Sequence, residues 1–116
     1  MGIFDVFKKK DNKKMQTIII KLDSRKLENP NLDIIYKLPK KIEEISNGTI
    51  LDNGYDYISQ TEIALFLETK SAENYKIVVE FLKKEKVCDC DLSKSAEIYI
   101  SKKENAEIED CKKVYL

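Results

Sequence analysis

The feature that most constrains the fold of this chain is the order of its apolar patterns. Segments that alternate apolar and polar side chains are typical of half-buried strands, and apolar residues three and four positions apart are typical of amphipathic helices. Along the chain these patterns follow one another as strand, helix, strand, strand, helix, strand. The expected bounds of the six elements are 15–22, 39–47, 49–58, 62–68, 72–86 and 96–101.

This order predicts an α+β fold of the ferredoxin-like type, in which a β-α-β-β-α-β chain forms an antiparallel sheet with both helices on one face. Alternation and helical spacing predict which side chains form the core. Those expected to do so are Ile18, Ile20, Leu22, Ile63, Leu65, Leu67, Tyr75, Val78, Val79, Leu82, Ile98 and Ile100. Because many unrelated functions share this scaffold, the order predicts a shape and leaves the activity open.

Two local signals concern the first helix and the second strand. Pro39 interrupts the apolar stripe of the helix, and since proline is tolerated in a first helical turn, we expect the better-formed helix to begin there. Residues 32–38 before it are compatible with a helical turn or with an extended segment. We expect it to end at Asn47, with Gly48 as its stop. The pair Asn53-Gly54 is compatible with a hairpin turn or with a bulge inside one strand.

The two ends of the chain lie outside this pattern. Residues 1–14 join a short apolar cluster to a lysine-rich tract, which predicts an N-terminal arm that docks on the domain or lies on a membrane surface. We favour the docked arm, because one short apolar cluster binds membranes only marginally. The ferredoxin-like domain is expected over 15–103. Residues 104–116 form a C-terminal extension, compatible with a short helix or an added edge strand.

The composition is typical of one soluble bacterial domain. The chain of 116 residues carries 21 basic and 21 acidic side chains, so its formal net charge is zero. Residues 1–41 are basic overall, however, and residues 42–116 are acidic overall. The three cysteines are unevenly spaced, and the apolar residues near the N-terminus are too few for a signal peptide. We therefore expect a cytoplasmic location.

Histidine is absent from the sequence, which removes the commonest general base and a frequent metal ligand. Cys88 and Cys90, with Cys111 further along, are the most suggestive group for a metal. Their spacing is not that of a C-x-x-C site, and the adjacent acidic residues disfavour the thiolate. We therefore expect no enzyme activity, no catalytic residue, no cofactor and no metal site.

The residues that best suit a binding site are Asp52, Tyr55, Asp56 and Tyr57 in the second strand. Aromatic side chains supply contact area in protein interfaces, and carboxylates attract a basic partner. This group therefore predicts a surface that binds another protein. The simpler interpretation is that the aspartates are ordinary turn residues and the tyrosines half-buried sheet residues.

The sheet face opposite the helices is expected to carry Ile19, Phe66 and Tyr99, with one of Tyr55 and Tyr57. An apolar face of this kind suits the N-terminal arm, a second subunit in a homodimer or a bound ligand. RNA-binding sheets of this layout stack bases on aromatic residues of their two central strands. Here the first strand has no aromatic residue and the net charge is zero, so we expect no nucleic-acid binding.

The chain opens with Met1-Gly2-Ile3-Phe4-Asp5-Val6-Phe7-Lys8-Lys9-Lys10. This opening resembles the starts of small cytoplasmic bacterial proteins, among them immunity proteins of polymorphic toxin systems. The middle of the chain, from residues 27–34 to residues 53–57, looks like bacterial domains without a named activity. The resemblance carries over no functional residue, but it implies a small domain that blocks a cognate toxin. We expect a non-catalytic protein-binding module, with a dimeric ligand-binding or regulatory domain as the alternative.

Overall fold

The alternating segments form strands and the apolar stripes form helices in the computed structural model, which describes residues 15–27 and 32–115. The strands are β1 (Gln16–Asp23), β2 (Ile50–Tyr57), β3 (Glu62–Thr69), β4 (Glu97–Ser101) and β5 (Lys112–Tyr115). The helices are α2 (Ile34–Ile45) and α3 (Tyr75–Lys84), and the 3-10 turns are η1 (Ser24–Lys26), η2 (Ala72–Asn74) and η3 (Ile108–Asp110). The arm expected over 1–14 lies outside the described residues.

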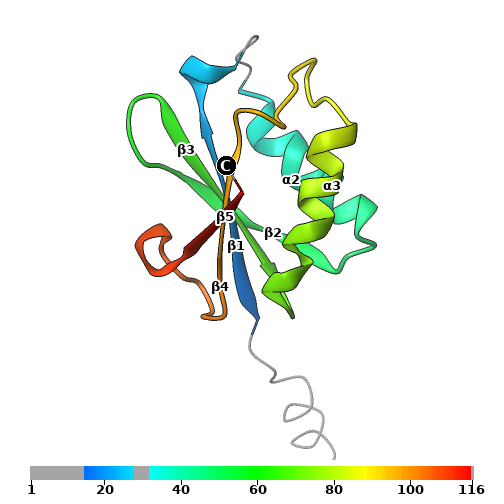
Figure 1. The fold of residues 1–116 in the computed structure, drawn as a ribbon, viewed down its shortest axis with the longest axis vertical. Coiled ribbons are helices and arrows are strands. Elements are labelled where there is room, and N and C mark those ends of the chain that lie inside the picture. Colours follow the sequence, from blue (N-terminus) through cyan, green and yellow to red (C-terminus); the bar gives the residue numbers. More distant parts are fainter. Residues whose placement is uncertain (1–14, 28–31, 116) are drawn as a thin grey trace, which may run out of the picture.

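The strands of the described chain form one antiparallel sheet in the order β2-β3-β1-β4-β5. Both helices lie on one side of this sheet, and the β4–β5 connection lies on the other (Figure 1). The predicted α+β class with an antiparallel sheet is confirmed. The last residues adopt both of the alternatives that the sequence leaves open, because the single turn η3 is followed by β5, which pairs with β4.

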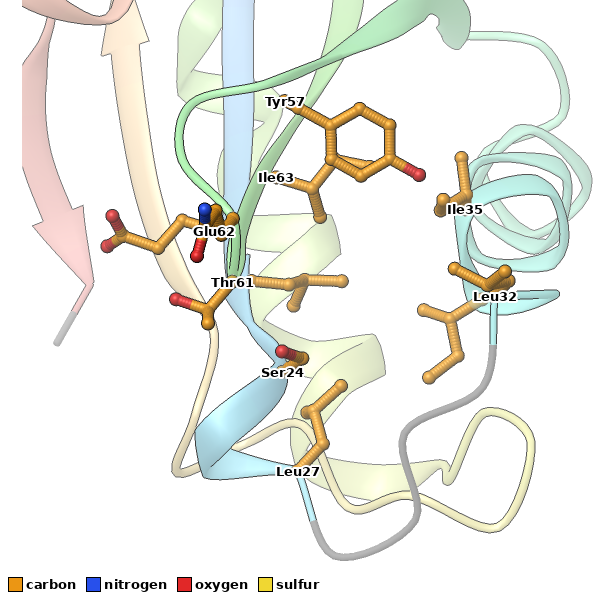
Figure 2. Close-up of a pocket in the computed structure, with 11 residues that line it drawn as sticks. Ser24, Leu27, Leu32, Ile35, Tyr57, Thr61, Glu62 and Ile63 are labelled. Atoms are coloured by element: carbon orange, nitrogen blue, oxygen red, sulfur yellow. The ribbon is translucent and has the colours of Figure 1, made fainter.

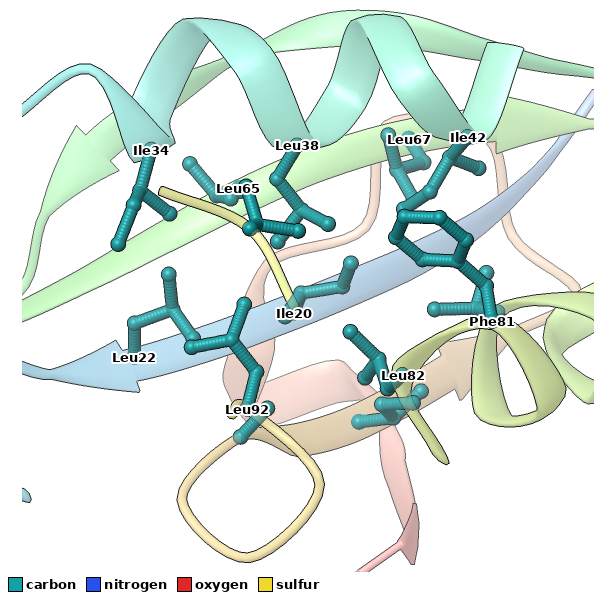
Figure 3. Packing of buried hydrophobic residues seen from close by; sticks show 14 of the residues in the cluster. Ile20, Leu22, Ile34, Leu38, Ile42, Leu65, Leu67, Phe81, Leu82 and Leu92 are labelled. Carbon is teal, nitrogen blue, oxygen red and sulfur yellow. The ribbon is translucent and has the colours of Figure 1, made fainter. Parts of the chain in front are cut away.

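The core lies between the helices and one face of the sheet. The strand register places Ile18, Ile20 and Leu22 of β1 opposite the alternate apolar residues of β3, so that all of them face the same way. Figure 3 shows Leu38 and Ile42 of α2 directed toward these strands. The fully buried side chains of this cluster are Ile18, Ile20, Ile34, Leu38, Ile42, Ile50, Leu65, Leu67, Leu82, Leu92 and Ile98. The predicted inward faces of β1 and β3 are confirmed.

The helix α3 is shorter than the sequence predicts. The turn η2 occupies the first predicted residues, with the Ser71 hydroxyl accepting a hydrogen bond from the Glu73 amide, and the regular helix ends at Lys84. Its buried side chains are Val78, Phe81 and Leu82, whereas Tyr75 and Val79 are only partly buried against the core. The predicted face is therefore correct at its centre and shifted at its edge toward Phe81.

The helix α2 begins at Ile34, so the segment before Pro39 is helical, one of the two alternatives left open for it, and the start expected at Pro39 is wrong. Proline lacks an amide hydrogen and leaves one helical carbonyl without its usual donor. The turn before it nevertheless buries Ile34, Ile35 and Leu38, each less than 9% exposed. The burial of three large side chains is worth several times the free energy of one lost hydrogen bond. Tertiary packing thus keeps the proline inside the helix.

The end of α2 also differs slightly from the prediction. The helix ends at Ile45, and Asn47 and Gly48 follow with φ angles of 53° and 79°. The amides of these two residues donate back to the carbonyls of Glu44 and Glu43, at 3.1 and 2.9 Å. Left-handed residues that return hydrogen bonds to the last turn are a common helix ending. Gly48 belongs to this stop, as predicted.

The strand β2 is continuous, with a bulge where the sequence leaves a hairpin turn open as an alternative. Its register against β3 shifts between Asp52 and Tyr55. Gly54 has a φ of 92°, which suits glycine, and its amide donates to the Asp52 carboxylate at 2.9 Å. The side-chain amide of Asn53 donates a hydrogen bond to the side-chain oxygen of Asn105 at 3.0 Å. The bulge is therefore held from both sides.

Candidate functional site

Three exposed tyrosines contact one another beside the outer edge of the sheet. The ring centroids of Tyr36 and Tyr55 are 6.1 Å apart, and those of Tyr55 and Tyr57 are also 6.1 Å apart. The rings of each pair are almost perpendicular, at 89° and 88°, a favourable arrangement for aromatic groups. The three side chains are 62%, 43% and 58% exposed. We call this group the tyrosine row.

The strand register explains why the row faces the helices. Tyr55 lies opposite Leu65 and Tyr57 opposite Ile63, and both partners point into the core. Side chains at paired positions share a face of the sheet, so both tyrosines point to the side of α2. Because β2 is the outermost strand there, their rings extend past the core into solvent. Tyr36 of α2 meets them from the exposed flank of the helix.

The contacts within the row affect its central hydroxyl. The neighbouring side chain of Tyr36, and to a smaller extent that of Tyr57, raises the pKa of Tyr55. The row presents aromatic rings with hydroxyl groups at their edges, a surface suited to contacts with another protein.

The structure separates the four residues that the sequence groups together. Tyr55 and Tyr57 belong to the row, whereas Asp56 lies opposite Ala64 and therefore points to the other face of the sheet. The carboxylate of Asp52 accepts a hydrogen bond inside the bulge. The predicted surface thus keeps its two aromatic members and gains Tyr36. The start of α2 at Ile34 would have revealed Tyr36, but Pro39 hides that start in the sequence.

An apolar pocket of about 180 Å³ adjoins the row at Tyr57. Figure 2 shows the Tyr57 ring beside Ile63 and across from Ile35, with Leu27 and Leu32 on the other side of the opening. The carboxylate of Glu62 points away from the apolar side chains. The full lining consists of Leu22, Ser24, Leu27, Leu32, Ile34, Ile35, Tyr57, Gln60, Thr61, Glu62 and Ile63. Its volume suits one large apolar side chain.

Two further exposed apolar side chains lie on the segments next to this opening, and Leu32 of the two lines it. Leu32 is 71% exposed at the pocket, and Ile58 is 43% exposed in the turn that follows Tyr57. Together with the tyrosine row they account for most of the large apolar side chains that are exposed in the described part of the chain, Ile45 being the other. Exposed apolar groups that gather in one place are typical of interaction sites, whereas scattered ones are ordinary.

The chain around the two tyrosines of β2 is acidic, whereas Tyr36 is followed in α2 by Lys37, Lys40 and Lys41. Between Lys41 and Lys70 the sequence contains six Asp or Glu residues and no Lys or Arg. This acidic stretch covers the end of α2 and the whole β2–β3 hairpin. Only Glu62 of the six has a salt bridge among the described residues, to Lys21 at 2.9 Å. A partner at this edge therefore meets a negative field.

The opposite face of the sheet carries Ile19, Phe66 and Tyr99, as the sequence predicts, but neither Tyr55 nor Tyr57, which face the helices. Ile19 lies directly between Phe66 of β3 and Tyr99 of β4, and it is fully buried within the single chain. Phe66 and Tyr99 are partly buried. The expectation that one of the tyrosines of β2 belongs to this face is wrong.

Charged groups occupy the half of this face near the end of β1. Lys21 lies 2.9 Å from Glu62 and 3.6 Å from Glu97, and Lys113 of β5 lies 3.6 Å from Glu97. The Tyr99 hydroxyl donates to Glu97 at 2.6 Å, and this bond, aided by the lysines, holds the pKa of Glu97 below its usual range. This half of the face is a polar network and not an apolar platform.

The β4–β5 connection covers the other half of the same face. The Thr17 hydroxyl of β1 donates to the carbonyl of Lys103 at 2.8 Å and accepts from the amide of Ala106 at 3.1 Å. Ala106 is 2% exposed. A hollow beside it is lined by Phe66 and Asn53, among others. The connection is therefore fastened to the sheet, and it leaves little of the expected open face to a dimer partner.

The cysteines occupy separate places. Cys88 and Asp89, with φ angles of 51° and 63°, form a tight turn between Val87 and Cys90, and Cys90 is buried. Burial and the neighbouring acidic residues raise the pKa of the Cys111 thiol to about 11. Among residues 15–27 and 32–115, no three His, Cys, Asp or Glu side chains form a group that could hold a metal ion.

Comparisons place no known protein beside this chain. No protein-family model, no curated protein and no solved structure matches it. In the described residues, no helix is both long enough and apolar enough to cross a bilayer. The surface formed by the tyrosine row, the pocket and the acidic stretch is therefore the candidate functional site.

Proposed function

We propose that the protein is a non-catalytic module that binds another protein through the tyrosine row and the adjoining pocket. The observation that carries this proposal is a row of three exposed tyrosines in contact, of which Tyr57 also lines an apolar pocket. Tyrosine is among the residues that dominate binding energy in interfaces, particularly where it surrounds a pocket that takes a partner side chain. The row supplies the contact area and the pocket an anchor point.

The charge of the site supports a basic partner. The acidic stretch has no basic residue of its own, and electrostatic attraction raises the rate at which oppositely charged proteins meet. The partner would then offer Lys or Arg side chains around an apolar anchor. Asp52 and Asp56, which do not touch the row, would contribute by steering the partner and not by direct contact with the anchor.

The most specific form of this proposal is an immunity-type inhibitor of a bacterial toxin. It is supported by the resemblance of the opening residues to immunity proteins and by the small size of the domain. Binding would block the toxin sterically, so no catalytic group is required. The absence of histidine from the sequence agrees with such a role. We place this activity in the bacterial cytoplasm.

We further propose that the domain is a ferredoxin-like sandwich with an added strand. The support is the antiparallel order β2-β3-β1-β4 with one helix after β1 and one after β3. The strand β5 extends this arrangement at the β4 edge. The fold assignment concerns the scaffold alone, and the proposed function depends on the surface of β2 and α2.

Site-specific crosslinking tests the proposed function. A photoreactive phenylalanine analogue at Tyr57 should capture one protein in a lysate of the native bacterium. The same analogue at Lys76 of α3, whose side chain is 70% exposed and lies on a different surface, is the matched control and should not capture it. The purified protein so identified should bind wild type in solution, and binding should weaken at least tenfold when Tyr36 and Tyr57 are both changed to serine. Equal capture from both positions, or unchanged binding by the double variant, would refute the proposal.

A further inference from the structure

The outer edge of β2 carries backbone groups without a neighbouring strand. The Ile58 amide donates to the Glu62 carbonyl at 3.0 Å, which fixes the hydrogen-bonding phase of the β2–β3 ladder. In an antiparallel ladder, successive residues of a strand direct their backbone groups to opposite sides. The backbone N–H and C=O groups of Asp56 therefore bond to β3, whereas those of Tyr55 and Tyr57 point away from β3. β2 ends the sheet as described, so these groups face solvent.

The side chains of β2 give this edge two different flanks. Tyr55 and Tyr57 lie on the flank next to α2, and Asp56 lies on the opposite flank. All three residues are exposed. A strand placed along this edge would direct alternate side chains toward an aromatic flank and toward a carboxylate. The edge therefore matches an extended segment that alternates apolar and basic residues.

Charge argues against a second copy of the chain as the occupant. Two β2 edges paired with each other over residues 55–57 would place Asp56 of one copy beside Asp56 of the other. Like charges on neighbouring strands destabilise the pairing. The acidic stretch also offers no lysine to compensate them. A segment with lysine or arginine removes this repulsion and replaces it with attraction.

We propose that the partner is held by strand addition, in which a short basic segment of the partner pairs with the outer edge of β2. This inference rests on the proposed function and specifies how the site holds its partner. Main-chain hydrogen bonds to Tyr55 and Tyr57 hold the segment, its apolar side chains contact the tyrosine row, and its basic side chains face Asp56.

The bulge sets the length of the paired segment. The register shift between Asp52 and Tyr55 bends the strand and interrupts its regular edge. Pairing is therefore confined to the part of β2 from Tyr55 to Tyr57. The short contact predicts that affinity depends strongly on each backbone hydrogen bond and on the pocket next to Tyr57.

A designed peptide tests this binding mode independently of the natural partner. The probe is a short acetylated and amidated peptide of alternating lysine and valine, titrated into the isotope-labelled full chain and followed by NMR. The amide signals of Tyr55 and Tyr57 should shift and gain protection from exchange, while those of β5 stay unchanged. A peptide with glutamate in place of lysine is the charge control and should bind at least tenfold more weakly.

Two variants separate the backbone from the side chain. Tyr57→Ala removes the ring and keeps the amide N–H, whereas Tyr57→Pro removes both and leaves the ladder to β3 intact, since that N–H points outward. Strand addition predicts that the proline variant binds the lysine–valine peptide about threefold to tenfold more weakly than the alanine variant. If circular dichroism shows that the proline variant does not fold, peptides N-methylated at alternate residues replace it. N-methylation removes the backbone N–H donors of the peptide, so it tests the same main-chain hydrogen bonds without a change in the protein.

The outcomes distinguish strand addition from the proposed protein-binding function. Equal affinity of the two variants with bound peptide would overturn strand addition and leave the proposed function to the crosslinking result. Absence of peptide binding, or equal binding of the glutamate peptide, would also overturn strand addition. Stronger loss with proline, together with shifts confined to the β2 edge, would establish it. Capture of a partner through Tyr57 without these signs would mean that the row binds by side chains alone.

Discussion

The two edges of the sheet are built in opposite ways. β5 has four residues, includes the exposed Lys112 and Lys113, and is fastened by the Tyr115 hydroxyl, which donates to the carbonyl of Ser93 at 2.6 Å. β2 has eight residues and no lysine, and it exposes two tyrosines. Short length and lysine are common ways of preventing strand addition at an edge. The β5 edge of the sheet is therefore protected against strand addition, and the β2 edge is left available for it.

The same contrast appears in what each edge buries. Of the eight residues of β2, Ile50 alone is buried, and the six from Asp52 to Tyr57 are exposed. In β5 both Val114 and Tyr115 pack against the core despite the shortness of the strand. A strand that buries so few side chains contributes little to the stability of the fold. The exposed residues of β2 therefore suit a role other than packing. Partner binding is such a role.

The largest expected effect concerns the core that both edges share. Ile20 of β1 is fully buried on the face that meets the helices. Its replacement in Ile20→Ala should lower the free energy of unfolding by about 2–5 kcal/mol, through lost burial and the cavity left behind. Tyr57→Ala at the β2 edge should lower it by less than about 1 kcal/mol. Urea unfolding followed by circular dichroism measures both, and equal losses would contradict the contrast between core and edge.

The next effect concerns the connection that leads to β5. Thr17→Val keeps the shape of the side chain but leaves the buried amide of Ala106 without its acceptor. We expect a loss of about 1–3 kcal/mol in the free energy of unfolding. Amide exchange should accelerate at Ala106 and remain unchanged along β2. Thr17→Ser, which retains the hydroxyl, is the control, and an equal loss in that variant would show that the hydrogen bonds are not the cause.

The bulge of β2 should be sensitive to its glycine. Gly54 has a φ of 92°, and a Cβ added there meets nothing within 4 Å. Gly54→Ala should therefore cost about 1–2 kcal/mol through backbone strain alone. Asn53→Ala, which removes one exposed hydrogen bond to Asn105, should change stability by less than about 0.5 kcal/mol. Thermal unfolding of the two variants tests this order, and a reversed order would contradict it.

A smaller effect is expected where Tyr115 fastens the β5 edge. Tyr115→Phe removes the hydroxyl that donates to Ser93 and leaves the ring in place. The cost should be about 0.5–1.5 kcal/mol, because the bond is partly buried. Tyr57→Phe at the other edge removes an exposed hydroxyl and should leave the free energy of unfolding unchanged within error. Similar losses for the two changes would show that the edges are not fastened differently.

Acid should weaken the end of β1 that joins the pocket. The Arg25 guanidinium and the Arg25 amide hold the pKa of Asp23 well below its usual range. A carboxylate with a lowered pKa contributes stability above its unfolded pKa, about 4, and this contribution is lost as the pH falls toward the folded value. Asp23→Asn should therefore flatten the fall of stability below about pH 4. Parallel acid profiles for wild type and variant would contradict this assignment.

Much of the fold could be predicted from patterns within single segments. The alternation in β1 and β3 fixes their inward residues, because both strands are central and one face of each is buried against the helices. The sequence left the structure of residues 32–38 open, since the rule for Pro39 is local and the burial that overrides it is tertiary. The strand β5 was left open as an alternative because four residues carry too little periodicity to distinguish it from a short helix.

The candidate site was predictable in part for similar reasons. Tyr55 and Tyr57 are two positions apart in one strand, so alternation predicts that they lie on the same face of the sheet. Which face that is depends on the bulge and on the register with β3. Asp56 falls between them and must face the other way. Tyr36 comes from a distant segment, and only the packing of α2 against β2 brings it to the row. Pockets formed between segments leave no trace in a local pattern.

Hydrogen exchange along β2 in the free protein tests the central claim most directly. The claim is that the β2 edge is open, with the backbone amides of Tyr55 and Tyr57 directed to solvent and that of Asp56 bonded to β3. NMR-detected exchange of the full chain should then show rapid exchange at Tyr55 and Tyr57 and slow exchange at Asp56 between them. Equal protection at all three positions would mean that the edge is already covered, and it would contradict the account.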